Sequence, residues 1–243
     1  MKKLFYAFIA LSLAFTACQP NRSGESERQC GRARVAACSA ESCCKSESMT
    51  LNTFEAIQLL PPCLNCRVSL MTAMKNRRSD REFEERNLSL KHLSNILWAA
   101  NGVNREDGRR TVPVAMGIYS IDTYVFLANG IFFYDPAAHK LLPFIEGDFR
   151  HLTGTQEFVS TAPLNLVFIA NFHQYIERNV PRERWLYFAA ANAGHSSQNV
   201  YLYAAAAGLR TVVRASVREQ ELLDQLGLDS NMNQFILAQT VGY

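Results

Sequence analysis

The sequence predicts an α+β domain in which helices flank a central sheet of mixed or antiparallel strands. Segments with helical apolar spacing alternate with short apolar runs typical of strands, and an Asn-Gly pair joins two of those runs as a hairpin turn. The chain has 243 residues, of which 48% are hydrophobic, and this is enough for one domain with a full core. No internal repeat interrupts this pattern.

The N-terminus has the pattern of an export signal. Lysines precede an uncharged apolar run at 4–17, which is too short to span a bilayer comfortably, and Cys18 follows directly. The stretch "FTAC" resembles the bacterial lipobox, although Phe15 stands where leucine is usual. We expect a signal peptide at 1–17 and a lipoprotein anchored to the membrane through Cys18, facing the periplasm. Ordinary cleavage without lipid, which would give a periplasmic protein, is the alternative.

Residues 18–66 predict a disordered, cysteine-rich tether that precedes a folded domain at 67–243. The stretch "CLNC" at 63–66 has the spacing of redox and zinc motifs, but no histidine lies among the cysteines and no strand–helix pattern precedes it. A tether, with or without disulfides, is therefore favoured over a metal site, and the state of the cysteines is left open. They are Cys30, Cys38, Cys43, Cys44, Cys63 and Cys66.

Two helices are expected at the start of the domain. Ser69 can cap a short helix that ends at the arginines of 77–81. A second helix at 90–101 places its apolar residues on one face, with Ser89 at its start and Gly102 just past its end.

The middle of the domain is typical of strands. The stretch at 122–136 is two apolar runs joined by Asn-Gly, which predicts a β-hairpin, and 140–144 is a possible third strand. Residues 148–162 then predict a helix, and 163–170 predict a buried strand.

A long helix is expected over 181–209, rich in alanine and aromatic residues, with Gly208 near its end. It is apolar nearly all round, which predicts burial by the domain or by a partner subunit. A strand at 211–216, a helix at 217–227 and a final strand at 234–243 complete the domain.

Composition and motifs exclude several function classes. Lys and Arg total 25 against 22 Asp and Glu, and a net charge of +3 does not indicate binding to nucleic acid. The sequence has no Gly-rich dinucleotide fingerprint, no His/carboxylate metal spacing and no Ser-His-Asp pattern. His195 stands alone on the long helix, where a histidine is more often a packing or interface residue. These absences favour a cofactor that carries the chemistry itself.

Four stretches resemble the FMN-dependent nitroreductase family, and within it the SagB-type dehydrogenase-like branch. They are "NRRSDREF", "ILWAANGVNREDGRRTVP", "SSQNVYLYAAAAGLRTVVRAS" and "ILAQTVGY", they occur in the family's order, and they extend over about residues 68–243. The resemblance implies a homodimer with one FMN at each end of the interface. It also implies electron transfer from NAD(P)H to a small acceptor such as a nitroaromatic or a quinone.

By this resemblance, Arg77, Ser79 and Arg81 occupy the Arg-x-Ser-x-Arg positions that hold FMN in the family. The chemistry suits these residues, because guanidinium groups bind phosphate bidentately and a serine hydroxyl adds a donor. A second cation near the flavin N1 and C2 carbonyl would stabilise the reduced cofactor. Arg78 is either a further contact or a solvated side chain, and Asp80 is interpreted as a turn residue or an arginine partner.

The stretch "RTVPVA" resembles the family's "RTAPSA" segment, which wraps the flavin. Pro113, Val114 and Ala115 occupy the corresponding positions, with Val114 in place of a serine. The stretch "TVVRAS" resembles the strand end whose backbone N–H groups face flavin N5. Ala215 and Ser216 fit that role, and Arg214 fits either a phosphate or flavin contact or a packing role.

Two departures from the family pattern leave a second hypothesis open. Many members continue past the "GY" strand with a basic segment that completes the phosphate site, and this sequence ends at Tyr243. The "SQPWHF" element of simpler nitroreductases is also absent, so neither the electron donor nor the acceptor is specified. The alternative is a non-catalytic lipoprotein that keeps the fold as a flavin-binding or interaction module.

Overall fold

The computed structural model describes residues 53–65 and 67–243. The expected signal peptide, the lipidation site at Cys18 and most of the expected tether lie outside the described residues. Within the described residues, no helix combines the length and the apolar character needed to cross a membrane.

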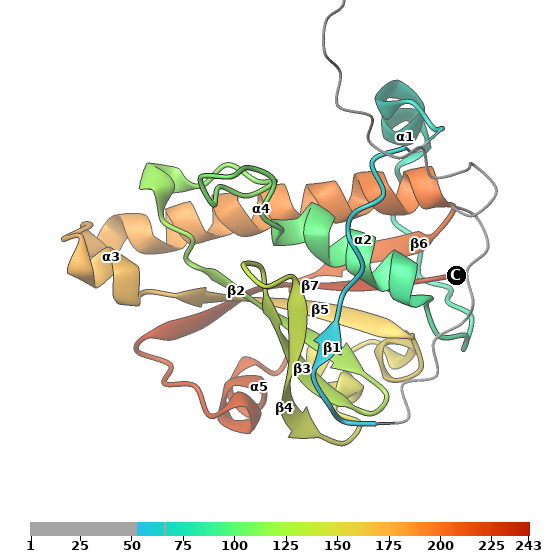
Figure 1. Ribbon diagram of the computed structural model, residues 1–243. Coiled ribbons are helices and arrows are strands. Elements are labelled where there is room, and N and C mark those ends of the chain that lie inside the picture. Colours follow the sequence, from blue (N-terminus) through green and yellow to red (C-terminus); the bar gives the residue numbers. More distant parts are fainter. Residues whose placement is uncertain (1–52, 66) are drawn as a thin grey trace, which may run out of the picture. The chain divides into compact units, whose positions relative to one another are not determined.

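The described residues form a seven-stranded sheet in the order β1-β4-β3-β2-β5-β7-β6 (Figure 1). Every neighbouring pair of strands is antiparallel, which confirms the predicted α+β class. The strands are β1 (Ile57–Gln58), β2 (Ile121–Leu127), β3 (Gly130–Asp135), β4 (Lys140–Glu146), β5 (Leu164–Asn171), β6 (Arg210–Arg214) and β7 (Asn233–Gly242).

Helices cover both faces of the sheet. In Figure 1, α2 and the long α4 lie above the sheet, α1 lies near the C-terminal end of α4, and α5 lies below the sheet. The α-helices are α1 (Leu70–Asn76), α2 (Leu90–Asn101), α3 (His173–Glu177), α4 (Arg182–Ala207) and α5 (Glu219–Leu226), and the 3-10 helices are η1 (Ala115–Gly117), η2 (Arg150–Thr153) and η3 (Glu157–Ser160).

The predicted helix ends are confirmed by the capping geometry. The side chains of Ser69 and Ser89 accept hydrogen bonds from the backbone N–H groups three residues later. Gly208 and Gly227 end α4 and α5 in the left-handed conformation, with φ of 71° and 64°. Such C-terminal glycines carry no Cβ penalty at positive φ, so these helices end where the sequence predicts.

The predicted hairpin of β2 and β3 is confirmed, but Gly130 serves a purpose other than the expected turn. It is the first residue of β3 and pairs with Leu127. A Cβ at this position would overlap the ring of Phe54 and lie 2.9 Å from the carbonyl oxygen of Ile145. Close packing therefore requires glycine here.

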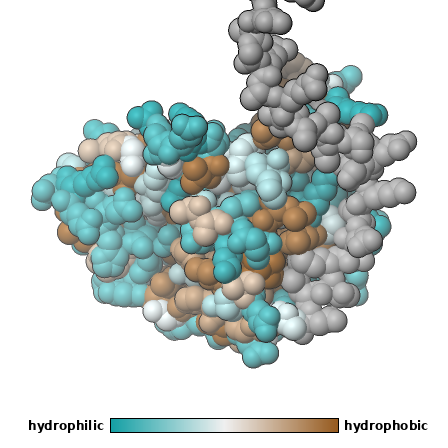
Figure 2. All heavy atoms as spheres, viewed as in Figure 1, coloured by the Kyte–Doolittle hydropathy of each residue, from teal (hydrophilic) through white to brown (hydrophobic). Residues whose placement is uncertain are grey.

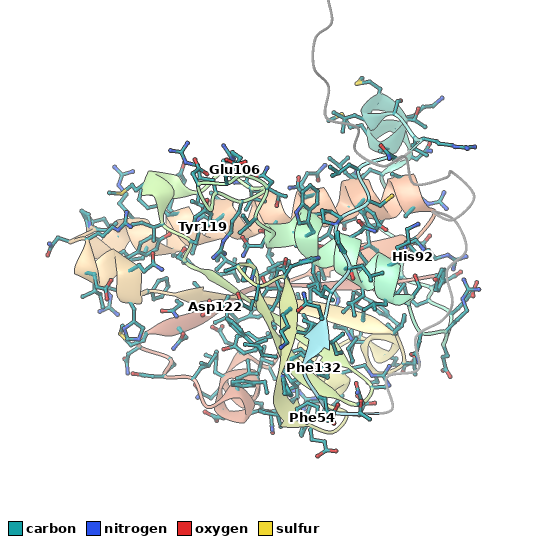
Figure 3. All side chains as sticks on the ribbon, in the orientation of Figure 1. Phe54, His92, Glu106, Tyr119, Asp122 and Phe132 are labelled. Carbon is teal, nitrogen blue, oxygen red and sulfur yellow. The ribbon has the colours of Figure 1, made fainter. Side chains whose placement is uncertain are left out.

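Residues 54–60 belong to the folded sheet, in contrast to the linker that the sequence analysis places there. Ile57 of β1 pairs with Leu141 of β4, and Leu59 is buried. The ring centroids of Phe54 and Phe132 lie 5.2 Å apart, and both residues are labelled in the lower part of Figure 3. Two apolar side chains and a short ladder are enough to hold this segment, although it is too short to show a periodic pattern.

The helix predicted at 148–162 is wrong, because the segment folds as the two short helices η2 and η3. Gly154 separates them, and a Cβ on Gly154 would overlap the Arg214 guanidinium. Arg214 also donates to the carbonyl oxygen of Thr153, which a continuous helix would use internally. A distant arginine therefore overrides the local helical tendency.

The core has one layer on each face of the sheet. The layer under α2 and α4 includes Ala189, Ala193, Val200 and Ala204 of α4, all fully buried. The other layer packs α5 and η2 against the sheet. Only one face of α4 is covered, because Leu186 and Tyr187 are 50% and 67% exposed. Figure 2 shows further apolar surface over the strands in the lower part of the view.

Candidate functional site

The segment at 77–82 runs along the free edge of β6. The backbone of α1 turns out of the helical conformation at Arg77, with ψ of 122°. The N–H of Asp80 then donates to the carbonyl oxygen of Thr211 over 3.0 Å. Arg210 lies 3.9 Å from carboxylate oxygens of both Asp80 and Glu82. These contacts hold the predicted anion-binding segment beside the end of the sheet.

Tyr201 of α4 connects this segment to β6. Its hydroxyl lies 2.7 Å from Ser79 Oγ and accepts the N–H of Val213 over 2.9 Å. The Arg77 guanidinium lies over the same tyrosine ring, 5.2 Å from the centroid. The sequence analysis missed Tyr201, because a tyrosine in an alanine-rich helix is typical of a packing residue.

A cavity of about 250 Å³ opens at the end of β6. It brings together four residues that the sequence analysis selects, namely Arg81, Arg214, Ala215 and Ser216. The remaining lining residues are Gln156, Phe158, Val212 and Val213.

Arg214 is a buried cation with neutral partners. Its side chain donates to Thr153 O, to Asn165 Oδ1 over 2.9 Å and to Thr240 Oγ1 over 2.6 Å. Its Nε has no hydrogen-bond partner among the described residues. Burial lowers the pKa of Arg214 to about 10, which leaves it charged at neutral pH. Packing holds this side chain in place, and its positive charge borders the cavity.

Gln156 is a second lining residue that the sequence analysis missed. Its Oε1 is buried without a hydrogen-bond partner among the described residues. Such a group typically costs about 1–3 kcal/mol, and most buried acceptors avoid this by pairing. The N–H of the neighbouring Thr155 donates to Ser216 O over 3.1 Å, so the loop that carries Gln156 is joined to the end of β6. Gln156 therefore places an unpaired carbonyl oxygen beside the cavity.

Arg78 is a solvated side chain in this structure. Its side chain is 80% exposed and its Nε lies 3.7 Å from Asp80 Oδ2. Asp80 also accepts from the N–H of Glu82 over 3.4 Å, so it is both a turn residue and an arginine partner.

The segment at 113–115 lies elsewhere on the chain, near the midpoint of α4. Ala115 N donates to Asn192 Oδ1 over 3.2 Å, and His195 Nδ1 donates to Pro113 O over 3.1 Å. Along the axis of α4, Tyr201 is roughly 13 Å from Asn192 and roughly 9 Å from His195. Within one chain, therefore, Pro113, Val114 and Ala115 do not line the cavity that contains Arg81 and Arg214.

The chemistry available at the cavity is that of binding and electrostatics. Its lining includes two arginines and an unpaired amide oxygen, but no carboxylate, histidine or cysteine. No group of histidine, cysteine or acidic side chains suited to a metal ion occurs among the described residues. Cationic donors of this kind recognise phosphate and carbonyl oxygens. The cavity therefore presents donors that suit an anionic or oxygen-rich ligand.

The comparison with protein families names the class. The nitroreductase family pattern matches residues 74–243, and the chain belongs to the nitroreductase family of oxidoreductases.

Individual relatives agree with this assignment. MJ1384, a presumed nitroreductase of Methanocaldococcus jannaschii, is 31% identical over 169 residues, which cover 65% of this chain and 84% of that protein. The crystal structure of a presumed nitroreductase from Ralstonia eutropha has 39% identity and a TM-score of 0.73, and the match covers 81% of this chain and 92% of that chain. A presumed nitroreductase from Desulfovibrio desulfuricans, solved in complex with FMN, shares the fold at 18% identity, with a TM-score of 0.52 and coverage of 72% and 86%.

Proposed function

We propose that this protein binds FMN at the β6-edge cavity and passes electrons from NAD(P)H to a small acceptor such as a nitroaromatic or a quinone. The observation that carries the proposal is the pair of cations at the cavity, Arg81 and the buried Arg214 with its neutral partners. The complex of the Desulfovibrio relative with FMN is a precedent for this cofactor on the same fold.

The residues present fit FMN on chemical grounds. Arg77 and Ser79 are suited to the phosphate, since a guanidinium and a hydroxyl both donate to its oxygens. The unpaired Oε1 of Gln156 is suited to an N–H, and the flavin pyrimidine ring carries one between two carbonyl groups. Arg81 and Arg214 would attract those carbonyl oxygens and any negative charge beside them.

FMN, when bound, supplies the hydride and electron chemistry, and the chain supplies the surroundings. Arg77 and Ser79 anchor the cofactor, Ala215 and Ser216 orient it through their backbone, and Phe158 helps to exclude water. Replacing Arg81 by alanine removes a cation that would stabilise the reduced flavin. The midpoint potential of the bound flavin should therefore fall by about 30 mV, which corresponds to about 1.4 kcal/mol for a two-electron couple.

We propose further that the working form is a homodimer in which residues 113–115 of a second copy complete the flavin site. The cavity of about 250 Å³ is smaller than the roughly 300–1,000 Å³ of typical cofactor pockets, so one chain would enclose only part of FMN. Apolar side chains that a partner could cover are exposed on α1 and α4. These are Leu70, Met71, Met74, Leu186 and Tyr187.

Two finer assignments rest on the sequence. We propose that the chain belongs to the SagB-type branch, on the four stretches that resemble it. We also propose export as a lipoprotein, because "FTAC" follows a short apolar run. A Cys18→Ser change should leave unprocessed precursor without lipid, and normal processing of that variant would contradict the lipid anchor.

An absorbance spectrum of the purified protein tests the main proposal. We expect flavin bands that bleach with NAD(P)H under anaerobic conditions and return when a nitroaromatic or quinone is added. Protein that neither retains nor rebinds FMN would contradict the proposal. Flavin that dithionite bleaches but NAD(P)H does not would instead support the non-catalytic flavin-binding alternative.

A further inference from the structure

We propose that Tyr201 is a positioning residue for phosphate recognition, acting through Ser79 and Arg77. The inference rests on the proposed function, because the phosphate in question is that of FMN. It adds a residue on α4 to the anion-binding segment at 77–81.

The bond between Val213 and Tyr201 has a defined direction, whereas either oxygen can donate in the bond between Tyr201 and Ser79. The Val213 N–H can only donate, so the tyrosine hydroxyl is the acceptor in that bond of 2.9 Å. The hydroxyl hydrogen of Tyr201 is then available to Ser79 Oγ at 2.7 Å. With Tyr201 as the donor, Ser79 keeps its own hydrogen for a phosphate oxygen. The chain of donors runs from the β6 backbone through Tyr201 and Ser79 to the ligand, and bonds in such chains strengthen one another.

The ring of Tyr201 acts on Arg77 at the same time. The guanidinium lies 5.2 Å from the ring centroid, and no carboxylate pairs with Arg77 among the described residues. The tyrosine ring thus orients the guanidinium without neutralising it, which leaves its N–H groups for an anion. Because Tyr201 is only 6% exposed, its ring is a fixed support.

A packing role alone predicts a different outcome. Strand β6 ends the sheet, and the Tyr201 hydroxyl satisfies an edge N–H that would otherwise need water. If this were its whole role, removing the hydroxyl would lower the stability of the protein and leave ligand selectivity unchanged. The two roles therefore separate when a ligand with the phosphate is compared with one that lacks it.

The test compares FMN with riboflavin, which has no phosphate. Wild type and Tyr201→Phe are freed of flavin and titrated with each ligand by fluorescence. We expect Tyr201→Phe to bind FMN about tenfold more weakly, the scale of a hydrogen bond to a charged group, and to bind riboflavin within about twofold of wild type. Equal losses for the two ligands, or an unchanged FMN affinity, would overturn the proposal.

A double-mutant cycle with Ser79→Ala sharpens the test. If Tyr201 acts through Ser79, the double variant should bind FMN no more than about twofold more weakly than the weaker single variant. Additive losses would mean that the hydroxyl does not act through Ser79. Ser79→Ala leaves Tyr201 unchanged, and the Ser79 side chain is at the surface, so the variant should fold. An unchanged ratio of FMN to riboflavin affinity in this variant would also overturn the proposal.

Tyr134→Phe is the matched control. It removes a buried hydroxyl on β3 that hydrogen-bonds His139 Nδ1 over 2.9 Å, and β3 is separated from β6 in the sheet by β2, β5 and β7. Its melting temperature should fall about as much as that of Tyr201→Phe, while its FMN affinity stays at the wild-type value. Failure of wild type to bind FMN at all would refute the proposed function itself. If wild type binds FMN and Tyr201→Phe binds it equally well, only the role of Tyr201 is refuted.

Discussion

Two parts of α4 hold two candidate cofactor segments in different ways. Near the midpoint of the helix, Asn192 and His195 use their side chains to fix backbone groups of the segment at 113–115. At the C-terminal half, Tyr201 supports Arg77 and Ser79, whose own donors remain available.

The two segments differ in whether their polar groups find partners within the same chain. Buried polar groups normally find partners inside the protein, and the bonds around 113–115 meet this rule. The cavity at β6 departs from it, because Gln156 Oε1 and Arg214 Nε are both buried without partners among the described residues. Thr123 Oγ1, Asn129 Oδ1 and Gln239 Oε1 are also buried without partners among the described residues, so what sets the cavity apart is that its two unpaired atoms lie beside two arginines.

Replacing Arg214 by alanine should have the largest effect and tests whether the C-terminal region depends on this cation. The change removes the donor to the carbonyl oxygen of Thr153 and to Thr240 Oγ1, whereas Asn165 Oδ1 keeps the hydrogen bond that it accepts from Thr240 Oγ1. Each unsatisfied buried acceptor costs about 1–3 kcal/mol, and water from the cavity would recover part of this, so we expect a loss of roughly 2–4 kcal/mol in unfolding free energy. Chemical denaturation of the apoprotein measures this loss. A variant whose unfolding free energy is within about 0.5 kcal/mol of wild type, the size of a surface change, would mean that Arg214 does not stabilise the fold.

Replacing Arg77 by alanine should affect binding rather than folding. We expect FMN affinity to fall by roughly 1.5–3 kcal/mol, the scale of a charge-assisted hydrogen bond, with an intact apoprotein fold. The adjacent Arg78 is the matched control, because its side chain is 80% exposed. Arg78→Ala should change FMN affinity by less than about 0.5 kcal/mol. Equal losses in the two variants would mean that the segment acts only as a diffuse positive charge.

Replacing Asn192 by alanine should destabilise the apoprotein, because its side chain anchors the segment at 113–115. Asn192 is buried, accepts the N–H of Ala115 and donates to Ser120 Oγ over 3.4 Å. Loss of these bonds should lower the unfolding free energy by about 1–2 kcal/mol. Thermal melts of the apoprotein check this. A melting temperature equal to that of wild type would mean that these hydrogen bonds do not stabilise the segment at 113–115.

The smallest expected effect concerns Asp122 of β2, whose carboxylate is attracted by the positive charge of Arg110. Burial raises the pKa of Asp122, although a hydrogen bond from Asn171 over 3.1 Å and the nearby Arg110 partly oppose this. The folded protein therefore binds this proton more tightly than the unfolded chain, and stability falls as pH rises from the unfolded pKa of 3.8 through the raised folded value.

Asp122→Asn removes this titrating group, and its side-chain oxygen can still accept the hydrogen bond from Asn171. The variant should gain stability relative to wild type at pH 7, by less than about 1 kcal/mol, and the gain should disappear in acid below the unfolded pKa. Urea denaturation at neutral and acidic pH measures the difference. A variant that is less stable than wild type at pH 7 would mean that the attraction between Asp122 and Arg110 outweighs burial.

The sequence by itself determined the parts of the molecule that depend on neighbours in the chain. Serines at the start of α1 and α2 and glycines at the end of α4 and α5 define helix ends through contacts a few residues long. The hairpin of β2 and β3 follows from alternating apolar runs and a turn. The selection of Arg81, Arg214, Ala215 and Ser216 also came from the sequence, through motif resemblance, and these four residues line one cavity.

Only the tertiary structure decided the features that depend on partners far along the chain. Ser79 and Tyr201 are 122 positions apart, and no local pattern relates them. Residues 148–162 break into two short helices because Arg214, distant in sequence, takes a carbonyl from their middle. The strand at Ile57 forms because β4 offers it a free edge. Local capping and apolar spacing are encoded within a few residues, whereas burial and hydrogen bonding of single side chains depend on which distant segments pack against them.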